Sequence, residues 1–289
     1  MFEIIFPENT GQHYYDIHFL YVLNIFKYLK CKISYEVRTD FVVTINGRDF
    51  LFDYRDTSDP PTSSLPVFKF HCVEETAGIF CFPPVSFYDW DRYYALEKEI
   101  QYNPLRSFWI SSRQRPYGDA TERRIKVQKT LKRLADDSDK LNAEHGWDVD
   151  DKSRHKILTG IIGQEDYWKE INDVDMAVFA PGYCNNMLDR AHLQYLAFGC
   201  LTVSPNIPEV LPFGKRLLGH DKFPNLMPQE TNCHYLKCKD DYSDVISIVM
   251  WKGIHSFVHP FIQISENAKT LFKETCTPEA VGKWIQSKL

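Results

Sequence analysis

The stretch from Met176 to Phe213 constrains the fold more than any other part of the chain, because it has the pattern of a strand, a helix and a second strand. The apolar run 176–179 ends at a Pro-Gly pair, which is typical of a buried parallel strand. Across 188–198, apolar side chains recur three and four residues apart, and a glycine ends this helical pattern. The apolar run 200–204 completes a strand–helix–strand unit, which predicts an α/β protein with a parallel sheet.

The loop between the first strand and the helix is the first candidate binding site. Ligands of parallel sheets bind beyond the carboxyl ends of the strands, and the polar loop with Gly182 and Tyr183 occupies that position. A helix that begins there directs free backbone N–H groups at a bound anion, and Arg190 would add a fixed positive charge. The alternative is a buried unit in which Arg190 pairs with Asp189 or Asp175, and the pattern leaves both open.

A second group of positive charges lies upstream of this unit. The apolar run 108–110 predicts a strand, and Arg113 and Arg115 follow it in a polar loop. A helix is expected over 121–135, with basic side chains that are typical of a solvated face. Residues 136–154 are acidic, and we expect an irregular surface segment there.

Acidic residues follow a predicted hairpin in the first third of the chain. An Asn-Gly pair at 46–47 separates two alternating apolar runs, which is a strong hairpin signal, and the second run leads into Asp53, Asp56 and Asp59. One interpretation is a solvated turn, since Asp is a turn former. The other is a site in which Asp53 or Asp56 acts as a general base. Lys69, in the next apolar run, could pair with one of these acids or lie at a sheet edge.

The composition sets the number of domains and the class of partner. A chain of 289 residues that is 44% hydrophobic can form two modest domains, and Asn103-Pro104 before a new strand predicts domains at 1–104 and 105–289. A net charge of −5 argues against nucleic acid as the main partner.

Eight cysteines without a Cys-x-x-Cys pair are typical of a reducing compartment. No stretch approaches the ~20 apolar residues of a transmembrane segment. We therefore expect a cytoplasmic protein.

The segment DRAHLQYLAFGCLTVSP and the later Leu-Pro-Phe at 211–213 resemble the signature of exostosin-type glycosyltransferases. Pro181 and Gly182 match that family's Pro-x-Gly, and Arg113 and Arg115 match the two arginines of its Gly-Arg-x-Arg segment, with serine in place of the glycine. The resemblance covers about residues 107–214 with gaps, and the first domain shows little of it.

The resemblance implies an α/β, GT-B-like fold in which two Rossmann-like domains face a cleft and the first domain is small. It implies transfer of a sugar from a nucleotide-sugar donor, UDP-linked and with UDP-xylose as one candidate, to a glycan or glycoprotein acceptor. The transfer is expected to be inverting and metal-independent, with no cofactor and with Asp53 or Asp56 as the base. The expected donor-binding residues are Arg113, Arg115, Gly182, Tyr183, Arg190 and Gln194.

One residue departs from the family pattern. The family has a Glu where this chain has Gln194, and an uncharged amide accepts a weaker bond from a ribose hydroxyl. This departure favours an alternative of another class, a noncatalytic nucleotide- or sugar-binding protein of the same fold. A nucleotide-sugar epimerase would need a nicotinamide fingerprint, and the sequence has no complete GxGxxG.

The compact layout is similar to the glycosyltransferases that large chlorella viruses encode, some of which are xylosyltransferases. For a viral protein, the cytoplasm in question would be that of the host cell.

Overall fold

The chain divides into two compact units. The structure is a computed structural model that describes residues 2–8, 13–55, 57–59, 61–84, 89–100, 109–116, 118–144, 156–160, 162–181, 187–188, 190–220, 232–254 and 259–289. Unit 1 consists of Met1–Ala95, Pro208–Arg216 and Leu271–Leu289, and unit 2 consists of Leu96–Ile207 and Leu217–Thr270. Each unit is described by itself.

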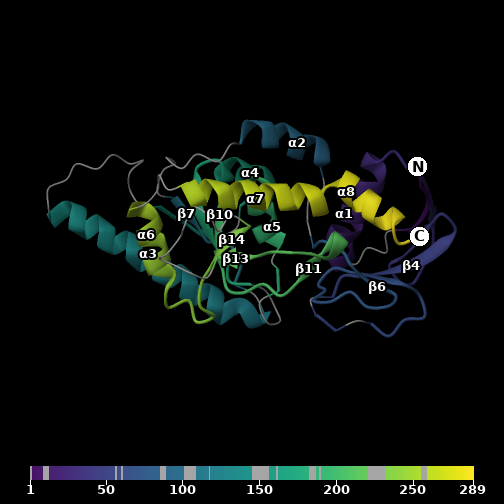
Figure 1. Ribbon diagram of the computed structural model, residues 1–289, viewed down its shortest axis with the longest axis horizontal. Coiled ribbons are helices and arrows are strands. Elements are labelled where there is room, and N and C mark those ends of the chain that lie inside the picture. The colour runs from purple at the N-terminus through teal and green to yellow at the C-terminus, as the bar shows by residue number, and fades with distance from the viewer. Residues whose placement is uncertain are drawn as a thin grey trace. The chain divides into compact units, whose positions relative to one another are not determined.

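Unit 1 is built on a mixed sheet whose described strands follow the order β2-β1-β3-β4-β5-β6 (Figure 1). The pairs β1–β2, β4–β5 and β5–β6 are parallel, and β3 is antiparallel to both of its neighbours. The carboxyl ends of β4, β5 and β6 therefore lie at one edge of the sheet. The strands are β1 (Glu3–Pro7), β2 (Lys32–Glu36), β3 (Val42–Ile45), β4 (Arg48–Asp53), β5 (Val67–Lys69) and β6 (Ile79–Cys81).

The β3–β4 hairpin forms as its sequence predicts. Asn46 has a φ of 51° and Gly47 a φ of 80°, the left-handed conformations that a two-residue hairpin turn requires. Phe50 and Phe52 alternate along β4, and both are buried with their ring centroids 4.9 and 5.0 Å from that of Phe68. Aromatic packing of this kind builds the unit 1 core.

Helices complete unit 1. Helix α1 (His13–Tyr28) contacts α8 (Pro278–Gln286), and Gly282 of α8 lies so close to Leu29 that a Cβ at this position would come within 2.7 Å of it. The strands β11 (Val210–Leu211) and β12 (Lys215–Arg216) form a small ribbon in the returning segment, with a short 3-10 helix (Pro212–Gly214) between them. Helix α2 (Trp90–Glu99) begins in unit 1 and ends in unit 2.

Unit 2 has a wholly parallel sheet among its described strands, in the order β13-β14-β10-β9-β7-β8. Every residue of the two central strands β9 and β10 is buried, as expected of strands covered on both faces. The strands are β7 (Trp109–Ser111), β8 (Lys156–Leu158), β9 (Val174–Val178), β10 (Leu201–Ser204), β13 (Gly219–His220) and β14 (Tyr235–Lys237).

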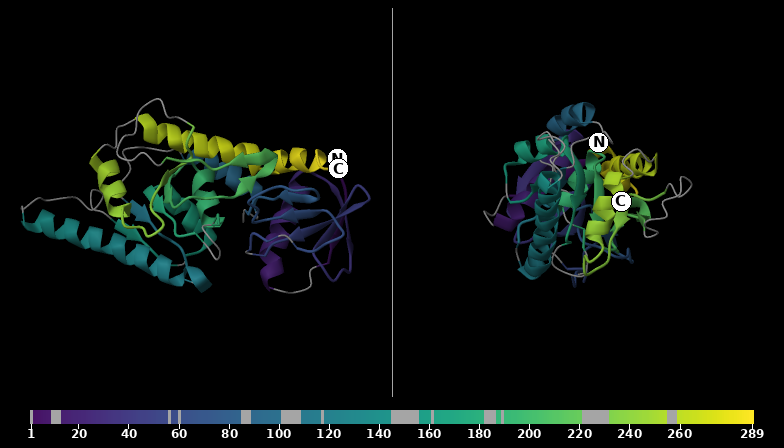
Figure 2. Two further views of the ribbon diagram at one scale, coloured as in Figure 1. Left: turned by 60° about the horizontal axis from the view of Figure 1, so that its bottom comes forward. Right: turned by 90° about the vertical axis from the view of Figure 1, so that its left-hand side faces the viewer.

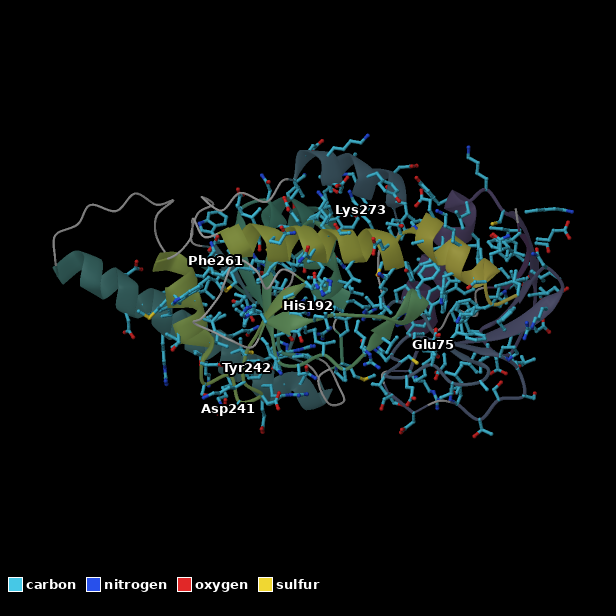
Figure 3. The ribbon with its side chains drawn as sticks, viewed as in Figure 1. Glu75, His192, Asp241, Tyr242, Phe261 and Lys273 are labelled. Atoms are coloured by element: carbon cyan, nitrogen blue, oxygen red, sulfur yellow. The ribbon has the colours of Figure 1, made fainter. Side chains whose placement is uncertain are left out.

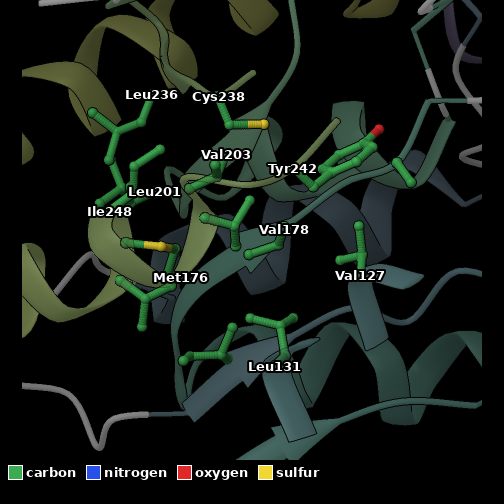
Figure 4. Packing of buried hydrophobic residues seen from close by; sticks show 14 of the residues in the cluster. Val127, Leu131, Met176, Val178, Leu201, Val203, Leu236, Cys238, Tyr242 and Ile248 are labelled. Atoms are coloured by element: carbon green, nitrogen blue, oxygen red, sulfur yellow. The ribbon is translucent and has the colours of Figure 1, made fainter. Parts of the chain in front are cut away.

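One face of this sheet packs against helices α3 (Thr121–Glu144), α6 (Val245–Ile254) and α7 (His259–Thr275). Tyr242 and Phe261 contribute to this core (Figure 3), and Figure 4 shows Met176 of β9, Val203 of β10 and Leu131 of α3 among its members. The C-terminal half of α3 extends beyond the sheet (Figure 1 and the left-hand view of Figure 2). Helices α4 (Gln164–Ile171) and α5 (Arg190–Ala197) pack against each other through their aromatic side chains.

The α/β class is confirmed, and so is the predicted strand–helix–strand unit, which is formed by β9, α5 and β10. The expectation of an irregular segment after residue 135 is wrong for 136–144, because α3 continues to Glu144. The division into units differs from the predicted domains 1–104 and 105–289, since the segments 208–216 and 271–289 belong to unit 1. Packing of α8 on α1 brings the end of the chain back to the first unit, and no local pattern reports that contact.

In the part of the chain that the structure describes, no helix combines the length and the apolar character needed to cross a bilayer.

Candidate functional site

The carboxyl edge of the unit 2 sheet holds the first candidate site. The connection from β7 leads to β8 on one side, whereas the connection from β9 leads to β10 on the other side. The direction of the connections therefore reverses between β7 and β9. In open parallel sheets ligands bind at such a switch point, outside the carboxyl ends of the strands. The loops that leave β7 and β9 at this edge, 112–116 and 179–181, are therefore the positions where a ligand is expected.

Hydrogen bonds hold these two loops to each other. The buried Gln114 accepts a bond from the backbone N–H of Ala180 at 2.5 Å through its Oε1. Arg124 of α3 donates to the carbonyl of Arg115 at 2.7 Å and to the carbonyl of Ala180 at 3.3 Å. Gln128, one turn further along α3, donates to the carbonyl of Gln114 at 3.0 Å. These hydrogen bonds fix the shape of the edge, and a preorganised site loses less free energy to ordering when a ligand binds.

A pocket of about 260 Å³ opens at the carboxyl ends of β7 and β8. Gly160, just after β8, has a φ of +88°, a conformation that L side chains rarely adopt, and the nearest atom to a Cβ placed there is Nη1 of Arg113 at 4.0 Å. A side chain at this position would be strained and would fill part of the pocket. The lining residues are Arg113, Arg115, Gly160, Ile162 and Tyr167.

The two arginines of this pocket have different surroundings. Arg113 makes a bidentate pair with Glu170 of α4, with Nε–Oε1 at 2.8 Å and Nη2–Oε2 at 2.5 Å, and it also donates to the carbonyl of Thr159. The hydrogen bond with Glu170 raises the pKa of the Arg113 guanidinium, and burial opposes this to a smaller extent. Arg115 is solvent exposed. The pocket therefore has one positive charge balanced by a carboxylate and a second one at its exposed rim.

Arg190 is the first residue of α5 and is half-buried. Of the two acids considered as its partners, Asp175 pairs with Lys252 of α6 in a buried ion pair, and Asp189 lies outside the described residues. The loop residues Gly182 and Tyr183 also lie outside the described residues, so their predicted contacts with a donor stay predictions.

Gln194 lies in the interface of α4 and α5. It is 5% exposed, and its Oε1 accepts a hydrogen bond from Nε1 of Trp168 at 2.9 Å. The amide oxygen that was expected to accept a bond from a ribose hydroxyl is thus bonded to an indole. The ribose contact stays a prediction, and this geometry favours a packing role.

His192 and Tyr195 anchor α5 to the strands, and neither role was predicted from the sequence. The His192 ring stacks on Phe179 with centroids 4.7 Å apart and bonds through Nε2 to Oγ1 of Thr202 at 2.8 Å. The hydroxyl of Tyr195 donates to Oγ of Ser111 at 2.5 Å, and burial raises the pKa of this tyrosine. Together these side chains hold α5 against the ends of β7 and β9 and against β10. The sequence signal that could have identified these two residues is a helical pattern with polar side chains on the face predicted to be buried.

The carboxyl edge of the unit 1 sheet holds a buried cluster of charges around Asp53. Its Oδ2 lies 3.0 Å from Nζ of Lys69, the residue opposite it in β5, and its Oδ1 lies 2.8 Å from Nε of Arg55. Burial raises the pKa of Asp53, but hydrogen bonds from Arg55 and Lys69 outweigh it, so the net pKa is lowered. Of the two alternatives for Lys69, pairing with an acid is correct. Asp56 lies outside the described residues.

A second buried pair at this edge joins distant parts of the chain. Nδ1 of His71, two residues beyond β5, lies 2.9 Å from Oε1 of Glu209 in the returning segment, and both side chains are buried. The backbone N–H of Val210 donates to the carbonyl of Cys72 at 2.8 Å, which holds the two segments together. This pair was not predicted from the sequence, because the two residues are 138 positions apart and only the fold makes them neighbours.

Within the described residues, no three His, Cys, Asp or Glu side chains are grouped as a metal site would require. No protein-family model and no curated protein matches this chain.

Proposed function

We propose that this protein is a glycosyltransferase of the GT-B type that moves a sugar from a UDP-linked donor to a glycan hydroxyl. The observation that carries the proposal is the arginine-lined pocket of about 260 Å³ at the carboxyl ends of β7 and β8. The carboxyl edge of a parallel sheet is where nucleotides bind in α/β proteins. Arginine is suited to a diphosphate, because its planar fork donates to two phosphate oxygens at once.

The proposed reaction is an inverting displacement at the anomeric carbon of the donor sugar. Its transition state has oxocarbenium character, and negative charge grows on the departing diphosphate. Arg115, at the rim of the pocket, would stabilise that charge, and Arg190 would do so together with the free N–H groups at the start of α5. Arg113 would act mainly by shaping the pocket, because Glu170 already holds its guanidinium on both sides.

In this proposal unit 1 binds the acceptor and supplies the general base. Asp53 and Asp56 stay the predicted candidates, although the two cations bonded to Asp53 lower its pKa and make it a weaker base. His71 is a further candidate. Its Nδ1 lies 2.9 Å from Oε1 of Glu209, and a carboxylate in this position can orient the imidazole of a general base.

The proposal is tested by thermal shift with UDP, with a series of UDP-sugars, and with NAD as a comparison. A ligand that binds the folded state adds about 2.7 kcal/mol to stability at a hundredfold excess over its dissociation constant. We expect stabilisation by UDP and at least one UDP-sugar, a loss of it in Arg115→Ala, and no change in Lys129→Ala, which removes an exposed charge of α3 in the same unit. Stabilisation by NAD with none by any nucleoside diphosphate would contradict the proposal.

The second candidate, a noncatalytic binding protein of the same fold, is favoured by the bond between Gln194 and Trp168. A transferase and a binding protein differ in turnover, so the assay is release of UDP from the stabilising donor in the presence of glycan acceptors. Release that persists in EDTA supports a metal-independent transferase. Binding without release of UDP would favour the second candidate.

A further inference from the structure

Strand β2 is the longest of the described strands that end the two six-stranded sheets. It has five residues, whereas the other edge strands, β6, β8 and β13, have two or three. It pairs with β1 without a register shift and contains neither Pro nor Gly. Among the described strands, only β1 pairs with β2. Proteins usually protect such an edge, because its outer backbone groups can pair with another chain.

The backbone of β2 alternates between β1 and the outer side of the sheet. The N–H of Lys32 donates to the carbonyl of Phe2 at 3.2 Å, so Lys32 directs its backbone groups to β1. Hydrogen-bonding groups point to opposite sides at successive residues of a strand. Ile33 and Tyr35 therefore direct their N–H and C=O groups away from β1, where a further strand can be added.

Exposed apolar side chains lie in the same segment. Tyr35 is 49% exposed, and Val37, just beyond β2, is 84% exposed, the highest value among the exposed large apolar side chains of the described residues. Tyr35 and Ile33 are on the face of the sheet where Ile4 and Phe6 of β1 are buried. A strand added to β2 would therefore extend the apolar core of unit 1 past its present edge.

We propose that β2 pairs antiparallel with β2 of a second copy of this chain, so that two unit 1 sheets join into one. A two-fold axis passes between the two copies of Ser34. In this register Lys32 of each copy lies opposite Glu36 of the other, and Ile33 lies opposite Tyr35. The interface is self-complementary, as a two-fold dimer requires. The proposal goes beyond the transferase function and does not depend on it.

The charges favour this register over its neighbours. Within one copy, Lys32 pairs with Glu3 at 3.4 Å and Glu36 pairs with Arg38 at 3.0 Å. The dimer brings these pairs together so that positive and negative charges alternate, and opposite charges across antiparallel strands are stabilising. Registers that keep the outward backbone groups opposite each other differ by two residues. One such shift places Lys32 opposite Arg38, and the other places it opposite Ser34.

The backbone provides a reporter for the register. Ile33 of one copy and Tyr35 of the other both direct their backbone groups outward, so this pair can exchange two hydrogen bonds. The two copies of Ser34 then form a pair without hydrogen bonds, in which the Cα atoms are about 4.5 Å apart. This distance lies within the range that a disulfide spans. Ser34→Cys should therefore form a disulfide between the copies.

The first test combines sedimentation velocity of the native 289-residue chain over a concentration series with oxidation of Ser34→Cys. We expect a species of twice the 33.9 kDa chain mass that grows with concentration, and a linked dimer of Ser34→Cys that dithiothreitol separates. Trypsin releases the peptide 33–38, which identifies the link and separates it from Cys31. Ser64→Cys, at an exposed serine of unit 1 outside the sheet, is the matched control and should not link. A chain that stays monomeric throughout would overturn the proposal.

Charge reversal is the second test. Lys32→Glu places two acids opposite each other, and Glu36→Lys places two bases opposite each other, so each variant alone should weaken self-association by about tenfold or more. A mixture of the two variants restores opposite charges and should form a heterodimer. Lys27→Glu reverses an exposed charge of α1 in the same unit and should leave association unchanged. A dimer that persists in both single variants without a Ser34→Cys link would refute the proposed interface, because self-association would then use another surface.

Discussion

The buried ion pair of Asp53 and Lys69 predicts that Asp53→Asn and Lys69→Met lower the stability of the protein by different amounts. Asp53→Asn would leave the ammonium of Lys69, which is 0% exposed, with one long hydrogen bond among the described residues, at 3.5 Å to the carbonyl of Arg55. Lys69→Met would leave the carboxylate of Asp53 with the guanidinium of Arg55, at 2.8 and 3.1 Å. The charge left behind is therefore compensated in the second variant and nearly uncompensated in the first.

The magnitude follows from this asymmetry. Removal of one partner of a buried ion pair costs about 3–5 kcal/mol, because an uncompensated charge stays buried. We expect Asp53→Asn to lie in this range. Hydrogen bonds to charged groups contribute about 1.5–3 kcal/mol, so the bonds to Arg55 that survive in Lys69→Met should reduce the loss there by at least about 1.5 kcal/mol.

Native-state hydrogen exchange of peptides from β4 and β5 is the assay, because it reports the opening free energy of this sheet separately from unit 2. Lys32→Met is the matched control: it removes an exposed pair with Glu3 in the same sheet, with side chains 82% and 75% exposed, and should cost less than about 1 kcal/mol. Equal losses for Asp53→Asn and Lys69→Met, or a larger loss for Lys69→Met, would refute the reasoning.

Three further predictions concern pH and the proposed donor site. Because the pKa of Asp53 is lowered in the folded state, the unfolded chain binds the proton of this carboxylate first as the pH falls. The stability that Asp53 contributes should be complete above about pH 4 and should be lost as the pH falls through the folded pKa. Acid titrations of the wild type and of Asp53→Asn should therefore converge below that range. Arg190→Ala should lower kcat for sugar transfer more than it weakens calorimetric affinity for the donor, and a folded variant with both unchanged would make Arg190 a structural residue. Gln194→Ala should cost about 1–3 kcal/mol in urea unfolding, because the buried indole N–H of Trp168 loses its acceptor, while UDP affinity stays within twofold if Gln194 has only a packing role.

Local patterns were sufficient where a structure depends on neighbours in sequence. Hydrophobic periodicity and glycine conformation depend on residues that are close together in the sequence. These two signals predicted the Asn46-Gly47 turn, the strand–helix–strand unit of β9, α5 and β10, and the α/β class. The same patterns placed Arg113 and Arg115 in one loop, and the structure gives that loop a shared pocket. They underestimated α3, because the acidic composition of residues 136–144 resembles a surface segment although the helix continues there.

The partners of the polar side chains were decided by tertiary structure alone. The sequence by itself determined that Asp53 ends a strand, that Gln194 lies on a helix and that Arg113 follows a strand. It could not determine that these residues bond to Lys69, Trp168 and Glu170, or that Glu209 returns to His71 from 138 positions away. Secondary structure follows from interactions a few residues apart, whereas a buried charge or amide takes its partner from whichever segment the packing of the core brings within hydrogen-bond distance, and that distance is independent of separation along the chain.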